Sequence, residues 1–79
     1  MKQHAALYVQ VGAFSNRSYA EKLQRQLRTV VHSPIQITKL YKAKILYRVQ
    51  IGPVKDQASA SKINRQLSSI GLNGKVLFA

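Results

Sequence analysis

Apolar residues recur along the chain with two different spacings, which separate predicted strands from predicted helices. In two short segments they alternate with other residues, and this period of two is typical of strands with one buried face; the positions are Val9, Val11, Val49 and Ile51. In two longer segments they recur at spacings of three and four, which predicts helices with one apolar stripe each. The stripes are Ala20, Leu23, Leu27 and Val30, then Ala60, Ile63, Leu67 and Ile70.

The two strand–helix segments are copies of one unit, offset by 40 residues. YVQVGAFSNRSYAEKLQRQL (8–27) aligns without gaps on RVQIGPVKDQASASKINRQL (48–67), and eight of the twenty positions are identical. Self-similarity at a fixed offset indicates one structural unit used twice. The identical pairs are Val9/Val49, Gln10/Gln50, Gly12/Gly52, Ala20/Ala60, Lys22/Lys62, Arg25/Arg65, Gln26/Gln66 and Leu27/Leu67.

Residues that start or stop regular structure stand at matching places in the two units. We expect Gly12 and Gly52 to end the strands. Asn16 and Asp56 then follow at the same repeat position, and both are favourable helix N-caps. We expect Gly71 to cap the C-terminus of the second helix, and Pro34 to close the exit of the first.

The remaining segments supply two further strands and complete the predicted fold. Residues 34–53 predict a strand on each side of a turn at 42–44, and Asn73-Gly74 predicts a turn before a last strand. The order β-α-β-β-α-β is the split βαβ topology, ferredoxin-like or RNP-like. We therefore expect an α+β domain in which two helices cover one face of a four-stranded antiparallel sheet and the other face is open.

The open sheet face is the predicted binding surface. For the last strand, alternation allows either Lys75 with Leu77 or Val76 with Phe78 to point outward; we expect the second pair, because Leu77 then joins the core. Amides bond hydroxyl and acetamide groups, rings pack on flat apolar faces and arginine pairs with acids, which suits an extended polymer. The alternative is an ordinary solvated sheet. The predicted outward residues are Tyr8, Gln10, Gln36, Thr38, Leu46, Arg48, Gln50, Val76 and Phe78.

The strongly positive charge of the chain favours anionic partners. The 79 residues are 46% hydrophobic, as in globular domains, and carry 13 Lys and Arg against 2 acids, a net charge of +11. Nucleic acid, an acidic polysaccharide or an anionic membrane surface would complement it. We expect the helix cations Lys22, Arg25, Arg28, Lys62 and Arg65 to be solvated. A second group lies near the predicted hairpin, and Arg48 is the one most suited to reach a ligand: Lys39, Lys42, Lys44 and Arg48.

Composition argues against catalysis in this domain. The chain has no cysteine, which removes disulfides, thiolate metal sites and cysteine nucleophiles. Its two acids, Glu21 and Asp56, do not form the converging pair of a glycan hydrolase, because Asp56 has a capping role. His4 and His32 have no nucleophile or ligand at a suggestive spacing. We expect no catalytic residue, no metal and no cofactor.

The chain is expected to be one domain of a larger protein. No apolar run approaches the roughly 18–20 residues of a membrane-spanning helix, and the start does not resemble a signal peptide. We expect residues 1–6 to be a flexible start or a cloning remnant and residues 7–79 to form the domain. A monomer is the default for so short a module.

The doubled VQxG element resembles the SPOR domain, the sporulation-related repeat of bacterial envelope proteins. YVQVGAF and RVQIGPV each lead into an A-x-x-[LI]-x-x-x-L helix, and the resemblance runs from about Leu7 to Phe78. It implies binding of septal peptidoglycan, with preference for denuded glycan strands whose stem peptides amidases have removed. It also implies a periplasmic location at the division septum, as a C-terminal module that targets a parent protein such as an amidase or lytic transglycosylase.

The resemblance also implies binding positions on the open face. Two of them depart from the family pattern: Ala13 stands where some members have a polar residue, and Leu46 where an aromatic is common. Tyr8 or Phe78 is expected to supply the ring instead. The family positions fall on Gln10, Ala13, Leu46, Arg48 and Val76, and with the outward set the predicted glycan-binding residues are Tyr8, Gln10, Ala13, Leu46, Arg48, Gln50, Val76 and Phe78.

Two alternatives remain open. LYVQVG resembles the shorter motif of RNA-recognition modules, with Tyr8 at the aromatic position, so binding of single-stranded RNA is one. Against it, the third strand KILYRVQIG presents Leu46, Arg48 and Gln50 outward, and Tyr47 has the wrong parity for stacking. The other alternative is a domain for protein interaction.

Overall fold

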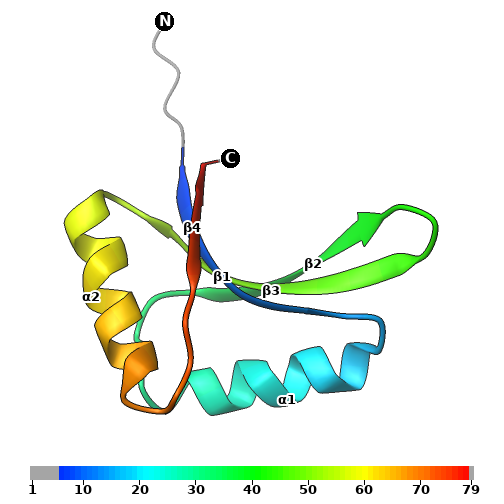
Figure 1. The fold of residues 1–79 in the computed structure, drawn as a ribbon, viewed down its shortest axis with the longest axis horizontal. Helices are drawn as coiled ribbons and strands as arrows, with labels where there is room; N and C mark the ends of the chain where they lie inside the picture. The colour runs from blue at the N-terminus through cyan, green and yellow to red at the C-terminus, as the bar shows by residue number, and fades with distance from the viewer. Residues whose placement is uncertain (1–5, 79) are drawn as a thin grey trace, which may run out of the picture.

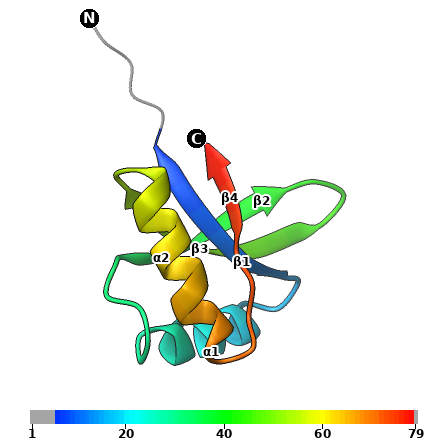
Figure 2. The same ribbon diagram turned by 60° about the vertical axis from the view of Figure 1, so that its left-hand side comes forward.

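The predicted α+β architecture is confirmed. In the computed structural model, which describes residues 6–78, the elements follow the order β-α-β-β-α-β. The four strands form one antiparallel sheet in the order β2-β3-β1-β4. Both helices lie on the same face of this twisted sheet (Figures 1 and 2). The elements are β1 (Leu7–Phe14), α1 (Arg17–Leu27), β2 (Ile35–Tyr41), β3 (Ile45–Val54), α2 (Gln57–Ser68) and β4 (Lys75–Phe78).

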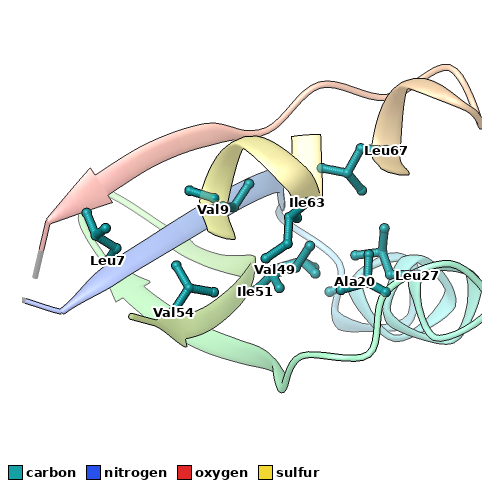
Figure 3. Close-up of a cluster of buried hydrophobic side chains, with 11 residues drawn as sticks. Leu7, Val9, Ala20, Leu27, Val49, Ile51, Val54, Ile63 and Leu67 are labelled. Atoms are coloured by element: carbon teal, nitrogen blue, oxygen red, sulfur yellow. The ribbon is translucent and has the colours of Figure 1, made fainter. Parts of the chain in front are cut away.

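The core lies between the sheet and the two helices, as the apolar spacing predicts. The largest fully buried side chains come from β1, β3 and both helices, and they meet in one cluster (Figure 3). Leu23 continues the stripe of α1 at a partly buried position. Val30 and Ile70, the last residues of the predicted stripes, pack against the core from the turns that follow the two helices. Because the helices bury one face of the sheet, the other face is left uncovered. The largest fully buried residues are Val9, Leu27, Val49, Ile51 and Leu67.

The predicted N-caps are also confirmed. Asn16 Oδ1 accepts a hydrogen bond from the backbone N–H of Ser18 at 2.9 Å, and Asp56 Oδ1 accepts one from that of Ser59 at 2.8 Å. Each cap satisfies an amide that would otherwise have no partner in the first turn of its helix. The two repeat units therefore begin their helices in the same way.

The C-terminal cap predicted for the second helix is confirmed: α2 ends at Ser68, and Gly71 closes its C-terminus in the left-handed region. Gly71 has a φ of 79°. Its N–H donates to the carbonyl of Ser68 at 3.0 Å, and the N–H of Leu72 donates to the carbonyl of Leu67 at 2.9 Å. These two bonds form a Schellman motif, which satisfies the last carbonyls of the helix and turns the chain back toward β4.

The prediction that Gly12 and Gly52 end the strands is wrong. Both strands continue two residues further, to Phe14 and Val54. The pairing of β1 with β3 shifts between Gln10 and Gly12, so β1 contains one extra residue there and Gly12 lies opposite Val49. Such a bulge changes which side chains face the core. Gly12 thus lies on the core side, whereas simple alternation places it on the open face.

The predicted outward register of β4 is wrong as well. Val76 pairs with the buried Val9 and packs against the core, and Phe78 pairs with the buried Leu7. Since directly paired residues point to the same side of a sheet, Val76 and Phe78 lie on the helix side. The residues of β4 that face outward are Lys75 and Leu77, which pair with Gln10 and Tyr8.

Candidate functional site: the open face of the sheet

The open face presents its side chains in rows that cross the strands. We define it by residues that alternate with the buried positions of their strands and pair with one another across the sheet. One row crosses all four strands through three glutamines and a lysine. The rows are Leu40–Leu46, Thr38–Arg48–Ala13, Gln36–Gln50–Gln10–Lys75 and Tyr8–Leu77.

The glutamine row is held in place by hydrogen bonds within the face. Gln50 is only 8% exposed even though it lies on the open side, and its Oε1 accepts a hydrogen bond from the Thr38 hydroxyl at 3.4 Å. Gln36 Nε2 donates to the carbonyl of Gly52 at 3.4 Å. Gln10, in the same row, is half-buried. The row therefore offers amide donors and acceptors whose positions are limited before any ligand arrives.

Arg48 lies in the next row, between two small neighbours. Its partners across the sheet are Thr38 on β2 and Ala13 on β1. The side chain is half-buried, and within residues 6–78 its Nε is a buried donor with no hydrogen-bond partner. A buried donor without an acceptor is unfavourable, so an incoming acceptor that reorients the guanidinium would relieve this cost.

Over residues 6–78, the open face carries positive charge without an acidic side chain. The chain has two acidic side chains, and both have structural partners elsewhere. Glu21 Oε2 lies 3.2 Å from Arg17 Nε on α1. The hydrogen bond from the backbone N–H of Ser59, with a second from its side chain, holds the pKa of Asp56 below its ordinary value. An anionic ligand on this surface would therefore meet Arg48 and Lys75 without a competing acidic side chain.

Apolar groups flank the polar rows on both sides. Tyr8 pairs with Leu77 at one end of the face, and Leu40 pairs with Leu46 at the other. All four side chains are partly exposed. Such groups can pack against the flat apolar face of a sugar ring, while the rows between them bond its polar substituents.

The structure brings most of the predicted site residues together on this surface. Two predicted residues, Val76 and Phe78, lie on the helix side. Sequence reasoning missed Leu40, whose place follows from the alternation Gln36, Thr38, Leu40 in β2. The predicted residues that do lie on the open face are Tyr8, Gln10, Ala13, Leu46, Arg48 and Gln50.

Lys75 and Leu77 were assigned to the wrong side because β4 gives little signal. Its four residues, KVLF, place three apolar side chains in succession, so either register buries an apolar group. The pairing with β1 decides the register, and that pairing is not visible in the sequence of β4 alone.

Other kinds of site are not found in the part of the chain that the structure describes. Within residues 6–78, no group of three or more His, Cys, Asp or Glu residues could hold a metal ion. Over the same residues, no helix has the length and hydropathy needed to cross a membrane. A cavity of about 210 Å³ lies away from the open face, between α2 and the loop before β2. It is lined by His32, Ser33, Ser59, Lys62, Ile63 and Gln66.

Comparison with known proteins agrees with the fold and the repeated motif. The SPOR domain family model matches residues 3–77. The endolytic peptidoglycan transglycosylase RlpA from each of two strains of Pseudomonas aeruginosa is 40% identical over 65 residues, which is 81% of this chain and 18% of the relative. The chain thus spans less than a fifth of these curated relatives. They agree with a resemblance of this chain to a domain of rare lipoprotein A, RlpA.

Solved structures show the same arrangement. The crystal structure of the RlpA SPOR domain from Pseudomonas aeruginosa superposes with a TM-score of 0.85 at 30% identity, over 90% of this chain and 96% of that one. The solution structure of the peptidoglycan binding domain of the B. subtilis cell wall lytic enzyme CwlC shares the fold, with a TM-score of 0.75 at 23% identity, over 100% and 95% of the two chains. With a family model matched over nearly its whole length and a repeated VQxG strand in both halves of the sheet, the chain belongs to the SPOR domain family.

Proposed function

We propose that this SPOR domain binds bacterial peptidoglycan through the open face of its sheet, without catalysis, and prefers denuded glycan strands. The observation that carries the proposal is Arg48, a cation with a buried, unpaired donor at the centre of a face that has no carboxylate. Two of the solved or curated relatives are named for peptidoglycan: the RlpA transglycosylase and the CwlC binding domain. The family, the charge and the polar rows therefore point to the same ligand.

The chemistry of a denuded strand complements this face. Such a strand alternates N-acetylglucosamine with N-acetylmuramic acid, whose lactyl group is a free carboxylate once the stem peptide is gone. Arg48 would pair with a lactyl carboxylate, Gln10 would bond an acetamide, and Tyr8 would pack on a sugar ring. A stem peptide replaces the carboxylate with a neutral amide and adds bulk, which gives a physical reason for the preference.

The role in the cell that we propose is targeting. A module that binds denuded strands would concentrate its parent protein in the periplasm at the septum, where amidases produce such strands. Any catalytic activity, such as that of a lytic transglycosylase or amidase, would belong to another part of the parent. The two acids of this domain already serve as a helix cap and an ion-pair partner.

A single substitution tests the role of Arg48. We expect Arg48→Ala to weaken binding to soluble denuded oligosaccharides about ten- to a hundredfold, the usual range for losing a hydrogen bond to a charged group. Arg48→Lys should retain part of the affinity, because it keeps the charge and loses the forked geometry. Isothermal titration calorimetry with denuded and peptide-bearing oligosaccharides measures both effects.

The matched control is Arg65→Ala, which removes the same charge from an exposed position on α2. It should bind as the parent domain does. Equal losses in the two variants would show that general positive charge, and not the open face, accounts for binding.

A further inference from the structure

The β2–β3 hairpin ends in a tip that is apolar on both faces of the sheet. Leu40 pairs with Leu46 on the open face, and the next pair outward, Tyr41 with Ile45, points to the opposite side. Exposed antiparallel strands ordinarily alternate between an apolar and a polar face. The first pair belongs to the proposed site on the open face, so Tyr41 and Ile45 are the pair that still lacks an assigned partner.

The outer pair has no partner within the domain. Tyr41 is 68% exposed and Ile45 is 39% exposed. Neither packs against the hydrophobic core, in contrast to Ile35, Ile37 and Tyr47, which lie farther from the turn on the same strands. Figure 1 shows the hairpin extending beyond the end of the layer that the helices cover. The tip is thus a projecting feature, with apolar area that folding leaves in water.

Positive charge surrounds this tip. Lys42 and Lys44 lie in the turn, closed by a hydrogen bond from the N–H of Lys42 to the carbonyl of Lys44 at 3.2 Å, and Lys39 precedes the apolar pairs. All three lysines are exposed. No acidic residue occurs between Glu21 and Asp56, so no carboxylate of the hairpin offsets them.

We propose that the hairpin tip docks on an anionic lipid bilayer, with Tyr41 and Ile45 entering the interfacial region and the lysines contacting headgroups. A projecting tip cannot enclose a ligand, but it can insert between the headgroups of a lipid bilayer. Tyrosine suits this depth because its ring is apolar and its hydroxyl is polar. Each lysine near an anionic bilayer strengthens adsorption by about fivefold. This inference is independent of the proposed glycan function.

Because the chain contains no tryptophan, a substituted tryptophan is a unique reporter. We expect Tyr41→Trp to show a blue-shifted emission, and protection from acrylamide quenching, with vesicles of phosphatidylglycerol and phosphatidylethanolamine. Vesicles of phosphatidylcholine alone should have no effect. The matched control is Phe78→Trp, at a residue with the same 68% exposure. Phe78 pairs with Leu7, which pairs in turn with Val54 on β3, and Val54 lies about 30 Å along that strand from Ile45 at the usual rise per residue. The emission of Phe78→Trp should therefore stay unchanged.

A second variant separates insertion from adsorption by charge alone. Tyr41→Ser combined with Ile45→Ser keeps every lysine, and we expect it to weaken vesicle binding about tenfold, the effect of removing roughly 50–60 Å² of buried apolar area. Its melting temperature should change little, since both residues are exposed. Unchanged vesicle binding by this variant, or no blue shift at position 41, would overturn the proposal. So would a blue shift produced by denuded oligosaccharides in place of vesicles, because the tip would then belong to the glycan surface.

Discussion

At the scale of single residues, Gly52 shows how a backbone position shapes the open face. Its φ is 148°, in a region that side chains rarely adopt, and a Cβ added there would lie 2.9 Å from both the Leu7 carbonyl oxygen and Tyr8 Cδ2. Its carbonyl also accepts the bond from Gln36. A side chain at this position would therefore displace Tyr8, a residue of the proposed site.

We predict that Gly52→Ala lowers the free energy of unfolding by about 2–3 kcal/mol, because the backbone conformation is strained and the added Cβ also meets Leu7 and Tyr8. Gly71→Ala is the comparison, because its φ is also positive but nothing lies within 4 Å of an added Cβ; it should cost about 1 kcal/mol. Chemical denaturation of both variants measures the difference. Equal losses would show that the contact with Tyr8 does not matter.

Asp56 gives a prediction about pH. Its pKa is lowered in the folded domain by hydrogen bonds from Ser59, so its ionised form stabilises the fold above the ordinary value of 3.8. That stabilisation is lost as pH falls below 3.8 through the lowered pKa. We expect Asp56→Asn to remain capped and to lose less stability than the parent domain between pH 5 and pH 2. Thermal melts across this range test it, and identical pH profiles would contradict it.

The capping residues were predictable because they act within one turn of chain. Asn16 and Asp56 each accept a hydrogen bond from a backbone amide no more than three residues further along the chain, so the local sequence is enough to predict the cap. The left-handed Gly71 is equally local. The position of Gly12 was not, because it depends on an extra residue in β1 relative to β3, whereas the sequence of β1 alone predicts regular alternation.

At the scale of elements, β4 has two faces with different predicted roles. Val76 packs against the core, whereas Leu77 pairs with Tyr8 on the open face. We expect Val76→Ala to cost about 1.5 kcal/mol of stability, from two lost methyl groups, and to leave glycan affinity unchanged. Leu77→Ala should weaken glycan binding with a smaller effect on stability.

Denaturation curves and calorimetry on these two variants give the test. The opposite assignment of effects would mean that β4 presents its other face to the ligand.

The helices were predicted more accurately than the strands for a physical reason. A helix stripe repeats over three turns in each unit, and the second unit repeats it again 40 residues later, so one irregular residue does not hide the pattern. Strand registers depend on pairing between distant segments. A four-residue strand with three adjacent apolar side chains leaves the choice of face to that pairing.

At the scale of the whole molecule, one side of the sheet packs with the helices to stabilise the fold, and the other side forms the proposed binding surface. The helices and one side of the sheet form the core. The opposite side presents the glutamine row, Arg48 and Lys75 without an acidic side chain. Net charge alone would suit nucleic acid equally well. The positions of the aromatic rings argue against nucleic-acid binding, because stacking of bases needs several rings on the open face. Tyr47 pairs with Phe14 on the helix side, which leaves Tyr8 as the aromatic residue in the described rows of the open face.

The fold and most positions of the candidate site could be predicted from the repeat and from the alternation of apolar residues in its strands. The identity of the ligand could not. The amides and one arginine predict an extended polar polymer with acidic groups. The choice of peptidoglycan rests on the SPOR resemblance, which the family model supports. Chemistry of the face then supplies the reason for preferring strands without stem peptides.

The most direct test of the central proposal is binding of the domain to purified sacculi before and after amidase treatment, with single-stranded RNA as competitor. We predict strong enrichment on treated sacculi, weak binding to untreated sacculi, no displacement by RNA, and loss of the enrichment in Arg48→Ala. Equal binding to both kinds of sacculi would contradict the preference for denuded strands. Displacement by RNA would show instead that the positive charge of the chain serves a nucleic acid.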